Sequence, residues 1–185
     1  MEDSDIIDLF FARQEQAIIE LSKKYGAVCS KIARNILSNS YDAEECVNDA
    51  YLGAWNTIPP ERPDPLLTYI CRIVRNLSIS RYHSNTAVKR NSFYDIAIDE
   101  LEECLASVSS VEEEISAKEL SALLDRFLET LDTENRVMFM RRYWYSDSVS
   151  DIAENFHMSS NNVFVRLSRI RGRLKKFLRK EGYEI

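Results

Sequence analysis

Glycine and proline are both scarce in this sequence, with four of each among 185 residues. Strands joined by tight turns use these residues often, whereas both disfavour the interior of a helix. All four prolines fall between Pro59 and Pro65, so the rest of the chain is open to long helices. The low content of both residues therefore favours an all-α fold over a strand-and-turn architecture.

Histidine is also scarce, and paired cysteines are missing. The two histidines stand far from the four cysteines, which form no C-x-x-C pair; the residues are His83, His157, Cys29, Cys46, Cys71 and Cys104. A structural zinc site needs about four such ligands at close spacing. We therefore expect reduced thiols, no metal ion and no cofactor.

The usual signatures of an enzyme are missing as well. The sequence has no Gly-rich phosphate loop, and its two histidines cannot complete a set of Ser, His and acid. Asp42, Glu44 and Glu45 are close together, but adjacent acids at the start of a helix usually complement the helix dipole. We therefore expect no catalytic residues, no enzyme activity and no small-molecule substrate.

Long apolar runs are absent too. No stretch approaches the roughly 18 to 20 apolar residues that a membrane span needs. The first residues, MEDSDIIDLF, are acidic and lack the basic region and apolar core of an export signal. We therefore expect a cytoplasmic protein without direct membrane insertion.

Charge is present in unequal blocks, although the whole chain has a net charge of −6. Residues 66–90 carry +5 and residues 161–180 carry +8, whereas residues 91–132 between them carry −10. Neither basic block contains Asp or Glu, although a solvated helix face usually mixes signs because opposite charges at i and i+4 stabilise it. These blocks predict binding to a polyanion such as nucleic acid, and a basic solvated surface is the alternative.

Apolar spacing predicts helices on both sides of an acidic segment. We expect helices over residues 6–37 with a break near Gly26, from Asp42 onwards, and over residues 66–83, 120–131 and 137–145. Between them, from residue 84 to residue 116, the pattern loosens into an acidic, Ser-containing segment with one marginal helix. The prediction is two small helical domains, residues 1–84 and 117–185, joined by an acidic linker over residues 85–116.

The second predicted domain contains a helix-turn-helix pattern, SVSDIAENFHMSSNNVFVRLSRIRGRL. Ser148 is placed to cap the first helix, and Ser159 is placed to cap the second. The turn falls at His157 and Met158. Gly commonly occupies the left-handed position in such a turn, but His adopts that conformation more readily than most residues.

The second helix of this pattern has one apolar stripe. Its members follow at spacings of 4, 3, 4 and 3 residues and are Val163, Leu167, Ile170, Leu174 and Phe177. If the stripe is buried, the start of the helix presents amides, cations and two apolar side chains to solvent. Arg reads guanine bidentately, Asn reads adenine and apolar groups touch the thymine methyl, so this face suits a DNA major groove. A packed three-helix bundle with a basic surface is the alternative.

Three blocks of the sequence resemble the bacterial sigma factors of the small, two-domain extracytoplasmic-function group. The blocks are, in order, YDAEECVNDAYLGAW, YICRIVRNLSISRYH and SDIAENFHMSSNNVFVRLSRIRGRL. The resemblance implies a protein that binds core RNA polymerase and directs it to promoters, with an anti-sigma factor as a further partner. The promoter sequence and the inducing signal do not follow from it.

The resemblance also implies three sets of functional residues. The set that binds polymerase is Asp42, Glu44, Glu45, Val47, Asn48 and Asp49. The set that binds the minus-ten element is Tyr69, Arg72, Arg75, Asn76, Ser80, Arg81 and His83, in which Tyr69 has an equal claim to be a core residue. The set that binds the minus-thirty-five element is Asn161, Asn162, Phe164, Val165, Arg166, Ser168, Arg169 and Arg173.

The acidic linker receives a hypothesis of its own. Polymerase channels that conduct nucleic acid are basic, so a polyanionic segment containing Glu112, Glu113 and Glu114 would lie in one as a nucleic-acid mimic. A solvated linker is the alternative. Two other classes of protein stay open from the sequence. One is a stand-alone helix-turn-helix regulator that binds duplex operators, and the other is an acidic interaction module that does not bind DNA.

Overall fold

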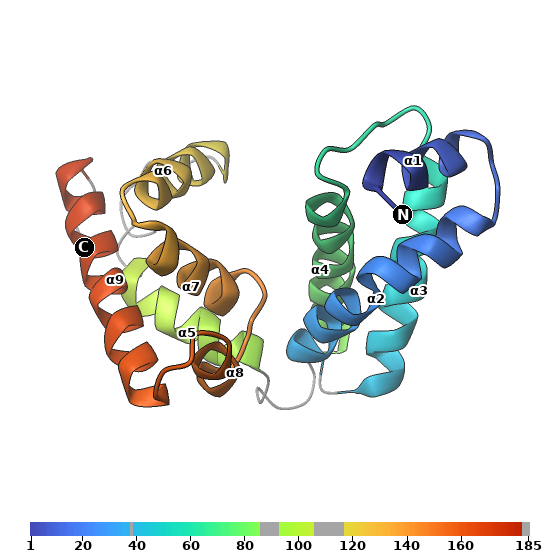
Figure 1. Cartoon of the computed structure of the whole chain (residues 1–185). Helices are drawn as coiled ribbons and strands as arrows, with labels where there is room; N and C mark the ends of the chain where they lie inside the picture. Colours follow the sequence, from blue (N-terminus) through green and yellow to red (C-terminus); the bar gives the residue numbers. More distant parts are fainter. Residues whose placement is uncertain (38, 86–92, 106–116, 183–185) are drawn as a thin grey trace. The chain divides into compact units, whose positions relative to one another are not determined.

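The computed structural model of the chain describes residues 1–37, 39–85, 93–105 and 117–182 (Figure 1). All regular secondary structure in these ranges is helical, which confirms the predicted all-α fold. The chain divides into two compact units, Met1–Ser92 and Phe93–Ile185, called unit 1 and unit 2 below.

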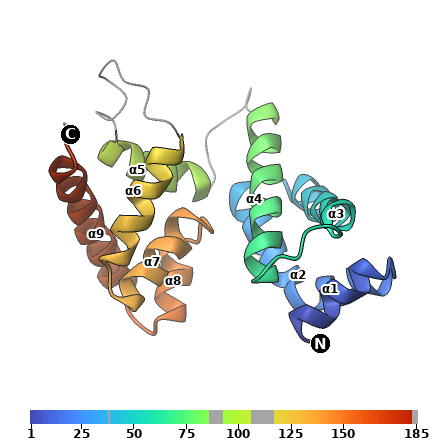
Figure 2. The same ribbon diagram turned by 90° about the horizontal axis from the view of Figure 1, so that it is seen from above.

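Unit 1 has four helices in its described residues: α1 (Asp3–Phe11), α2 (Gln16–Ile36), α3 (Ser40–Thr57) and α4 (Leu66–Asn85). The helices α2, α3 and α4 pack against one another, and α1 lies against α2, as the views in Figures 1 and 2 show. Each helix contributes an apolar side to the core, which includes Phe10, Leu21, Ile32, Ala50, Ile70 and Val74. The periodicity of the sequence therefore corresponds to the buried side of these helices.

The break predicted near Gly26 is wrong, because Gly26 lies inside α2. The first two helices separate at residues 12–15, where Arg13 has a positive φ of 51°. A glycine in a helix costs about 1 kcal/mol relative to alanine, a cost that packing of a long helix outweighs. At this position glycine also permits a close approach, since an added Cβ would lie 3.2 Å from the hydroxyl oxygen of Tyr51.

The start predicted for the next helix is wrong by two residues. The helix α3 begins at Ser40, and Asn39 is its N-cap. The Asn39 side-chain oxygen accepts a hydrogen bond from the backbone N–H of Tyr41 at 2.9 Å. Asn is as good an N-cap as Asp, so Asp42 and Glu45 lie within the helix and are available for contacts with other helices.

Unit 2 has five helices in its described residues: α5 (Phe93–Leu105), α6 (Ala117–Glu129), α7 (Thr133–Tyr143), α8 (Val149–Asn155) and α9 (Ser160–Lys180). Its core is largely aliphatic, with Met138, Ile152 and Leu167 almost fully buried. Aromatic contacts add to it, because the Phe127 and Phe139 rings lie 6.1 Å apart between centroids. The helices α8 and α9 are the two helices of the predicted helix-turn-helix.

The helix α5 lies inside the segment that we expected to act as a linker. Its Ala97 is buried in the core of unit 2, and the helix packs against α7 and α9. The segment over residues 85–116 therefore contains a helix that belongs to unit 2. Glu112, Glu113 and Glu114 lie outside the described residues, and their role as a nucleic-acid mimic stays a prediction.

Glu100 anchors α5 to the rest of unit 2. Its carboxylate accepts hydrogen bonds from Arg142 at 2.8 Å, from the Tyr143 hydroxyl at 3.0 Å and from Arg171 at 3.1 Å. Arg142 is only 2% exposed and also donates to the backbone oxygen of Asp147 at 2.9 Å. A buried guanidinium that lacks a carboxylate is costly, so docking of α5 is part of the stable fold of unit 2.

Candidate nucleic-acid and polymerase interfaces

The helix-turn-helix has the caps and the turn that the sequence predicts. Ser148 Oγ accepts a hydrogen bond from the Asp151 N–H at 3.1 Å, and Ser159 Oγ accepts one from the Asn162 N–H at 3.2 Å. His157 has a φ of 52°, in the left-handed region expected at this turn. These local bonds fix where α9 begins and how it leaves α8.

The helix α9 buries one stripe and exposes the opposite side. Val163, Leu167, Ile170 and Leu174 are all at most 2% exposed, and the stripe ends with Leu178 while Phe177 is half-buried. Seven of the residues predicted to bind the minus-thirty-five element are exposed: Asn161, Asn162, Phe164, Val165, Ser168, Arg169 and Arg173. Arg166 is half-buried beside them. The structure thus places this predicted set along α9, from its first turn to Arg173.

Two cations of this surface are held by neighbouring groups of unit 2. Arg166 Nη1 lies 2.5 Å from a carboxylate oxygen of Glu134, and Arg173 Nη2 donates to the backbone oxygen of Thr130 at 3.0 Å. Between the start of α7 and α9 lies a cavity of about 410 Å³ lined by Asp132, Glu134, Asn135, Arg166, Arg169, Ile170 and Arg173. Carboxylates therefore stand directly beside the predicted DNA-binding cations.

Asp132 is one of these carboxylates and caps α7. It accepts a hydrogen bond from the backbone N–H of Asn135 at 2.9 Å, which lowers the pKa of the Asp132 carboxyl group. The side-chain amide of Asn135 donates to the same carboxylate at 2.6 Å. Asp132 is thus kept ionised, and its hydrogen bonds direct it towards α7.

The helix α4 exposes four of the residues predicted to bind the minus-ten element. Arg72, Asn76 and Ser80 follow one another at intervals of four, and His83 lies three residues further on, so they form one ridge. Arg75 is half-buried to one side of this ridge. The ring of His83 contacts that of Tyr82 edge-on, with centroids 5.7 Å apart. The ridge presents hydrogen-bonding and cationic groups to solvent.

Tyr69 does not belong to this exposed ridge. It is 9% exposed, and its hydroxyl lies 2.6 Å from Thr57 Oγ1 at the end of α3. Burial raises the pKa of Tyr69, and the Arg72 guanidinium lies 5.6 Å from its ring centre. Tyr69 therefore packs the start of α4 against α3, which is the core position that the sequence left open as its alternative, and its ring is not part of the exposed ridge.

Arg81 also departs from the predicted arrangement. Its Nη1 atom lies 3.0 Å from a carboxylate oxygen of Glu45 and 3.7 Å from one of Asp42, both on α3. Position 81 follows the buried Val74 by seven residues and the buried Ser78 by three, which places it on the packed side of α4. Arg81 therefore faces α3, away from the ridge that contains Arg72.

The residues predicted to bind polymerase occupy two sides of α3. Asp42, Glu45 and Asp49 share one side by their spacing of three and four, and the first two contact Arg81. Glu44 and Asn48 line a groove on the other side. Val47 is only 6% exposed and lines that groove, so its part in polymerase binding stays a prediction.

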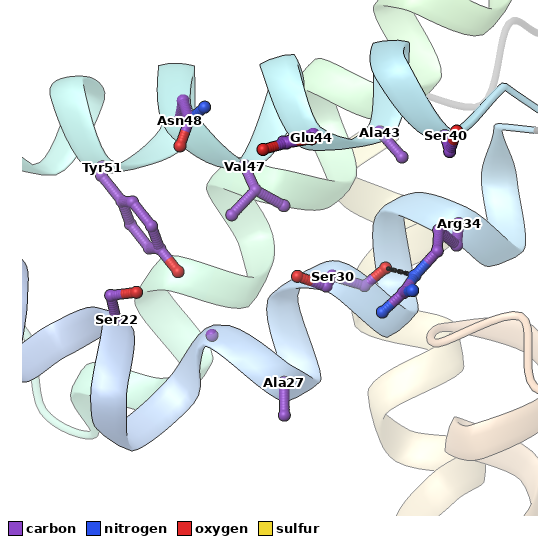
Figure 3. A pocket seen from close by; sticks show the side chains of 11 residues that line it. Ser22, Ala27, Ser30, Arg34, Ser40, Ala43, Glu44, Val47, Asn48 and Tyr51 are labelled. Carbon is purple, nitrogen blue, oxygen red and sulfur yellow. Dashed lines mark hydrogen bonds between the residues drawn. The ribbon is translucent and has the colours of Figure 1, made fainter.

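The groove between α2 and α3 has a volume of about 440 Å³ (Figure 3). The Tyr51 hydroxyl points across it towards Ser22, and Arg34 donates to the Ser30 backbone oxygen at 3.1 Å. Burial raises the pKa of Tyr51. The lining residues are Ser22, Gly26, Ala27, Ser30 and Arg34 from α2, and Ser40, Ala43, Glu44, Val47, Asn48 and Tyr51 from α3.

The α2 side of this groove was not predicted from the sequence. A signal for it is present, because Ser22, Gly26 and Ser30 follow at intervals of four and give α2 one side of small residues. Small side chains permit another helix to approach closely. The contribution of α2 becomes visible only once α3 is placed beside it.

The described residues show neither a cluster of metal-ligating side chains nor a membrane-spanning helix. No group of three or more His, Cys, Asp or Glu side chains there is arranged to hold a metal ion. No helix within the described ranges has both the length and the apolar character needed to cross a membrane. Cys29, Cys46 and Cys71 are buried free thiols.

Comparisons with known proteins match a segment of each unit. Residues 21–88 match the family model of Sigma-70 region 2, and residues 121–174 match that of Sigma-70, region 4. One similar solved structure is that of CnrH in complex with the cytosolic domain of CnrY, with 22% identity, a TM-score of 0.45 and coverage of 97% of this chain and 99% of that chain. No curated protein matches the chain.

The two family matches fall on the parts that carry the candidate interfaces. Region 2 covers α3 and α4, and region 4 covers the helix-turn-helix through most of α9. Together the two matches span more than half of the chain, in the order that the resemblance to the extracytoplasmic-function group implied. The chain therefore belongs to the sigma-70 family, and it is a sigma factor that binds core RNA polymerase and promoter DNA and directs transcription initiation.

Proposed function

We propose that each unit performs a separate part of promoter binding. Unit 1 binds core RNA polymerase through α2 and α3 and the minus-ten element through α4, and unit 2 binds the minus-thirty-five element through α9. The observation that supports this division most is the surface of α9. Its start exposes amides, cations and two apolar side chains while the opposite stripe is buried.

The face of α9 has the chemistry needed to read duplex DNA. Phe164 and Val165 are 53% and 36% exposed, which is unfavourable in water but suits contact with thymine methyl groups. Asn162 offers an amide for adenine, and Arg169 a guanidinium for guanine. Each good bidentate contact to a base is worth about 1–3 kcal/mol of discrimination, so two or three such residues are enough to select a promoter element.

The ridge of α4 suits a DNA strand whose bases are accessible. Arg72 provides a cation for phosphates, and Asn76 and Ser80 provide hydrogen-bonding groups. With Tyr69 buried, the aromatic surface at the end of the ridge consists of His83 and its neighbour Tyr82. Stacking of a base on such a ring is worth about 1–3 kcal/mol, so these two rings are the proposed stacking surface.

The groove between α2 and α3 is proposed to receive a helix of core polymerase. Its floor is apolar at Val47, and its rim has the exposed polar residues Glu44 and Asn48. The small residues of α2 let the backbone of a partner helix come near. A helix with an apolar side and flanking cations would match this combination.

We place the protein in the cytoplasm with core polymerase, and we propose an anti-sigma factor as its regulatory partner. Sigma factor families are non-enzymatic regulators, and we propose that this chain acts by binding alone. Co-purification of a second protein with the tagged chain from its host would support the regulatory partner, and recovery of core polymerase alone would speak against it.

Replacement of Arg166 and Arg169 by Ala tests the role of α9. We expect a loss of at least about tenfold in promoter affinity of the holoenzyme, because the guanidinium proposed to read guanine and a neighbouring cation are removed, with unchanged affinity for core polymerase. The matched control replaces Lys175 and Arg179 by Ala, which removes the same charge from the far end of α9. Equal loss of core binding and promoter binding in the first variant would refute the division of roles.

The substitution Asp49→Lys tests the role of α3. Asp49 is exposed, so the change should leave the fold intact while it reverses a charge on the proposed polymerase surface. We expect weaker binding to core polymerase in a pull-down titration. Duplex binding by the isolated chain should not weaken, and a variant that binds core normally would remove Asp49 from the interface.

A further inference from the structure

Arg81 is bound between α3 and α4 by a small polar cluster. Its Nη1 atom lies 3.0 Å from Glu45 Oε2 and 3.7 Å from Asp42 Oδ1. Asn85, one turn further along α4, donates to the other Asp42 oxygen at 2.9 Å. Two carboxylates of α3 are therefore turned towards the C-terminal end of α4.

The cluster lies at the surface, where its members can exchange partners. The side chains of Arg81, Glu45 and Asp42 are 32%, 56% and 21% exposed. Glu45 raises the pKa of Arg81, and a guanidinium is charged in proteins in any case. An exposed ion pair of this kind contributes little to stability, which means that a stronger anion could replace the carboxylates without unfolding unit 1.

The three residues belong to two different sets in the proposed function. Asp42 and Glu45 belong to the set that binds polymerase, and Arg81 belongs to the set that binds the minus-ten element. While Arg81 Nη1 is engaged with these carboxylates, the guanidinium has less of its charge and fewer of its donors available for a DNA phosphate. Binding at one surface therefore changes the groups available at the other, and such coupling between two ligands is reciprocal.

We propose that Glu45, assisted by Asp42, is a positioning residue that holds Arg81 away from DNA until core polymerase engages α3. When the carboxylates of α3 take up contacts with polymerase, Arg81 becomes available to the phosphates of the minus-ten strand. This inference rests on the proposed function of α3 and α4. It adds that the two surfaces communicate through one ion-pair cluster.

The size of the effect follows from the exposure of the pair. Exposed ion pairs change an equilibrium by about two- to fivefold. Glu45→Gln should therefore raise the affinity of the isolated chain for single-stranded DNA by about two- to fivefold. The same substitution should reduce, by the same factor, the enhancement of DNA affinity that core polymerase provides. Asp42→Asn should act in the same direction with a smaller effect, since its oxygen lies further from Arg81.

The experiment measures binding of a fluorescent single-stranded DNA of mixed sequence by anisotropy, with and without purified core polymerase. Wild type, Glu45→Gln, Arg81→Ala and the double variant form a cycle, and Glu15→Gln is the control for loss of one exposed carboxylate on unit 1. The gain from Glu45→Gln should vanish in the Arg81→Ala background and should shrink at high salt.

The outcomes separate the inference from the function on which it rests. If Arg81→Ala leaves DNA affinity of the holoenzyme unchanged, Arg81 is not part of the minus-ten surface, and both statements about it fail. If Arg81→Ala weakens binding but Glu45→Gln has no effect, the proposed DNA surface stands and the coupling is overturned. An equal gain with Glu15→Gln, or a gain that persists without Arg81, would also overturn the coupling, because it would reflect net charge alone.

Discussion

At the scale of single residues, unit 2 contains a guanidinium that depends on one carboxylate. Arg142 is almost fully buried, and the Glu100 side chain that pairs with it is 18% exposed. Arg171 and Tyr143 hydrogen-bond to the same carboxylate. Glu100 therefore completes the polar contacts of residues from two other helices.

We expect Glu100→Gln to destabilise unit 2 by about 1–3 kcal/mol, because the buried guanidinium loses its charged acceptor. Urea unfolding followed by circular dichroism measures this, with the transition of unit 1 as an internal reference. The control Asp99→Asn removes a neighbouring exposed carboxylate of α5 and should change stability little. If both variants unfold like wild type, α5 is not anchored by this cluster.

Glu134 is a second carboxylate with a defined partner, since it pairs with Arg166 on the proposed DNA-binding face. We expect Glu134→Gln to raise the affinity of the holoenzyme for promoter DNA by about two- to fivefold. In the wild type, Arg166 must give up its ion pair with the Glu134 carboxylate before it binds DNA, and the variant has no such ion pair to break. Filter binding at several salt concentrations measures this, with Glu129→Gln as control. Weaker promoter binding would show instead that Glu134 orients Arg166 for its contact.

The exposure of the site residues was predictable in the middle of a helix face, and less so at its edges. Arg72, Asn76 and Ser80 lie in the middle of an exposed side, and their role in DNA binding stays a prediction. Tyr69 and Arg81 lie at the margin of the packed side of α4, where contact depends on what the neighbouring helix offers. Tyr69 contacts Thr57, and Arg81 contacts Glu45. Spacing within α4 cannot reveal either contact, because both partners belong to α3.

At the scale of elements, the helix-turn-helix was predictable because its signals are local. Ser148, His157 and Ser159 each determine the backbone through bonds to residues a few positions away. The helix α5 was not clearly predictable, because its acidic sequence is held by residues far along the chain, namely Arg142 and Arg171. The boundary between α1 and α2 was also mispredicted, because packing keeps α2 helical through Gly26, where the sequence predicted a break.

Gly172 provides a test of α9 as an element. It lies within the helix, and an added Cβ would meet no atom within 4 Å. We expect Gly172→Ala to stabilise unit 2 by about 0.5–1 kcal/mol, because alanine loses less conformational entropy in a helix. Thermal unfolding measures the change. A loss of stability would mean that position 172 contacts a group outside the described residues.

At the scale of the whole molecule, charge explains why the chain requires a partner to use its basic surfaces. The full chain has 30 acidic residues against 24 basic ones, so its net charge opposes association with DNA. The segments of α4 and α9 contain basic residues and no acidic ones, and acids of neighbouring helices engage Arg81 and Arg166. DNA binding should therefore be weak for the isolated chain and strong once core polymerase contributes its own contacts.

The comparison between free chain and holoenzyme also separates this protein from a stand-alone regulator. Such a regulator binds a duplex operator without polymerase. In a mobility-shift titration with promoter duplex, we expect the isolated chain to bind at least about a hundredfold more weakly than the holoenzyme, given that specific complexes exceed non-specific ones by about a thousandfold or more. Equal affinities would contradict the dependence on polymerase.

Run-off transcription tests the central claim most directly. Purified core RNA polymerase is supplied with a genomic promoter library, with and without the chain, and the transcripts are sequenced from their 5′ ends. We predict discrete start sites that share an upstream element, that require the chain and that disappear with Arg166→Ala and Arg169→Ala. Transcripts that are identical with and without the chain, or start sites that the double variant leaves unchanged, would contradict the account.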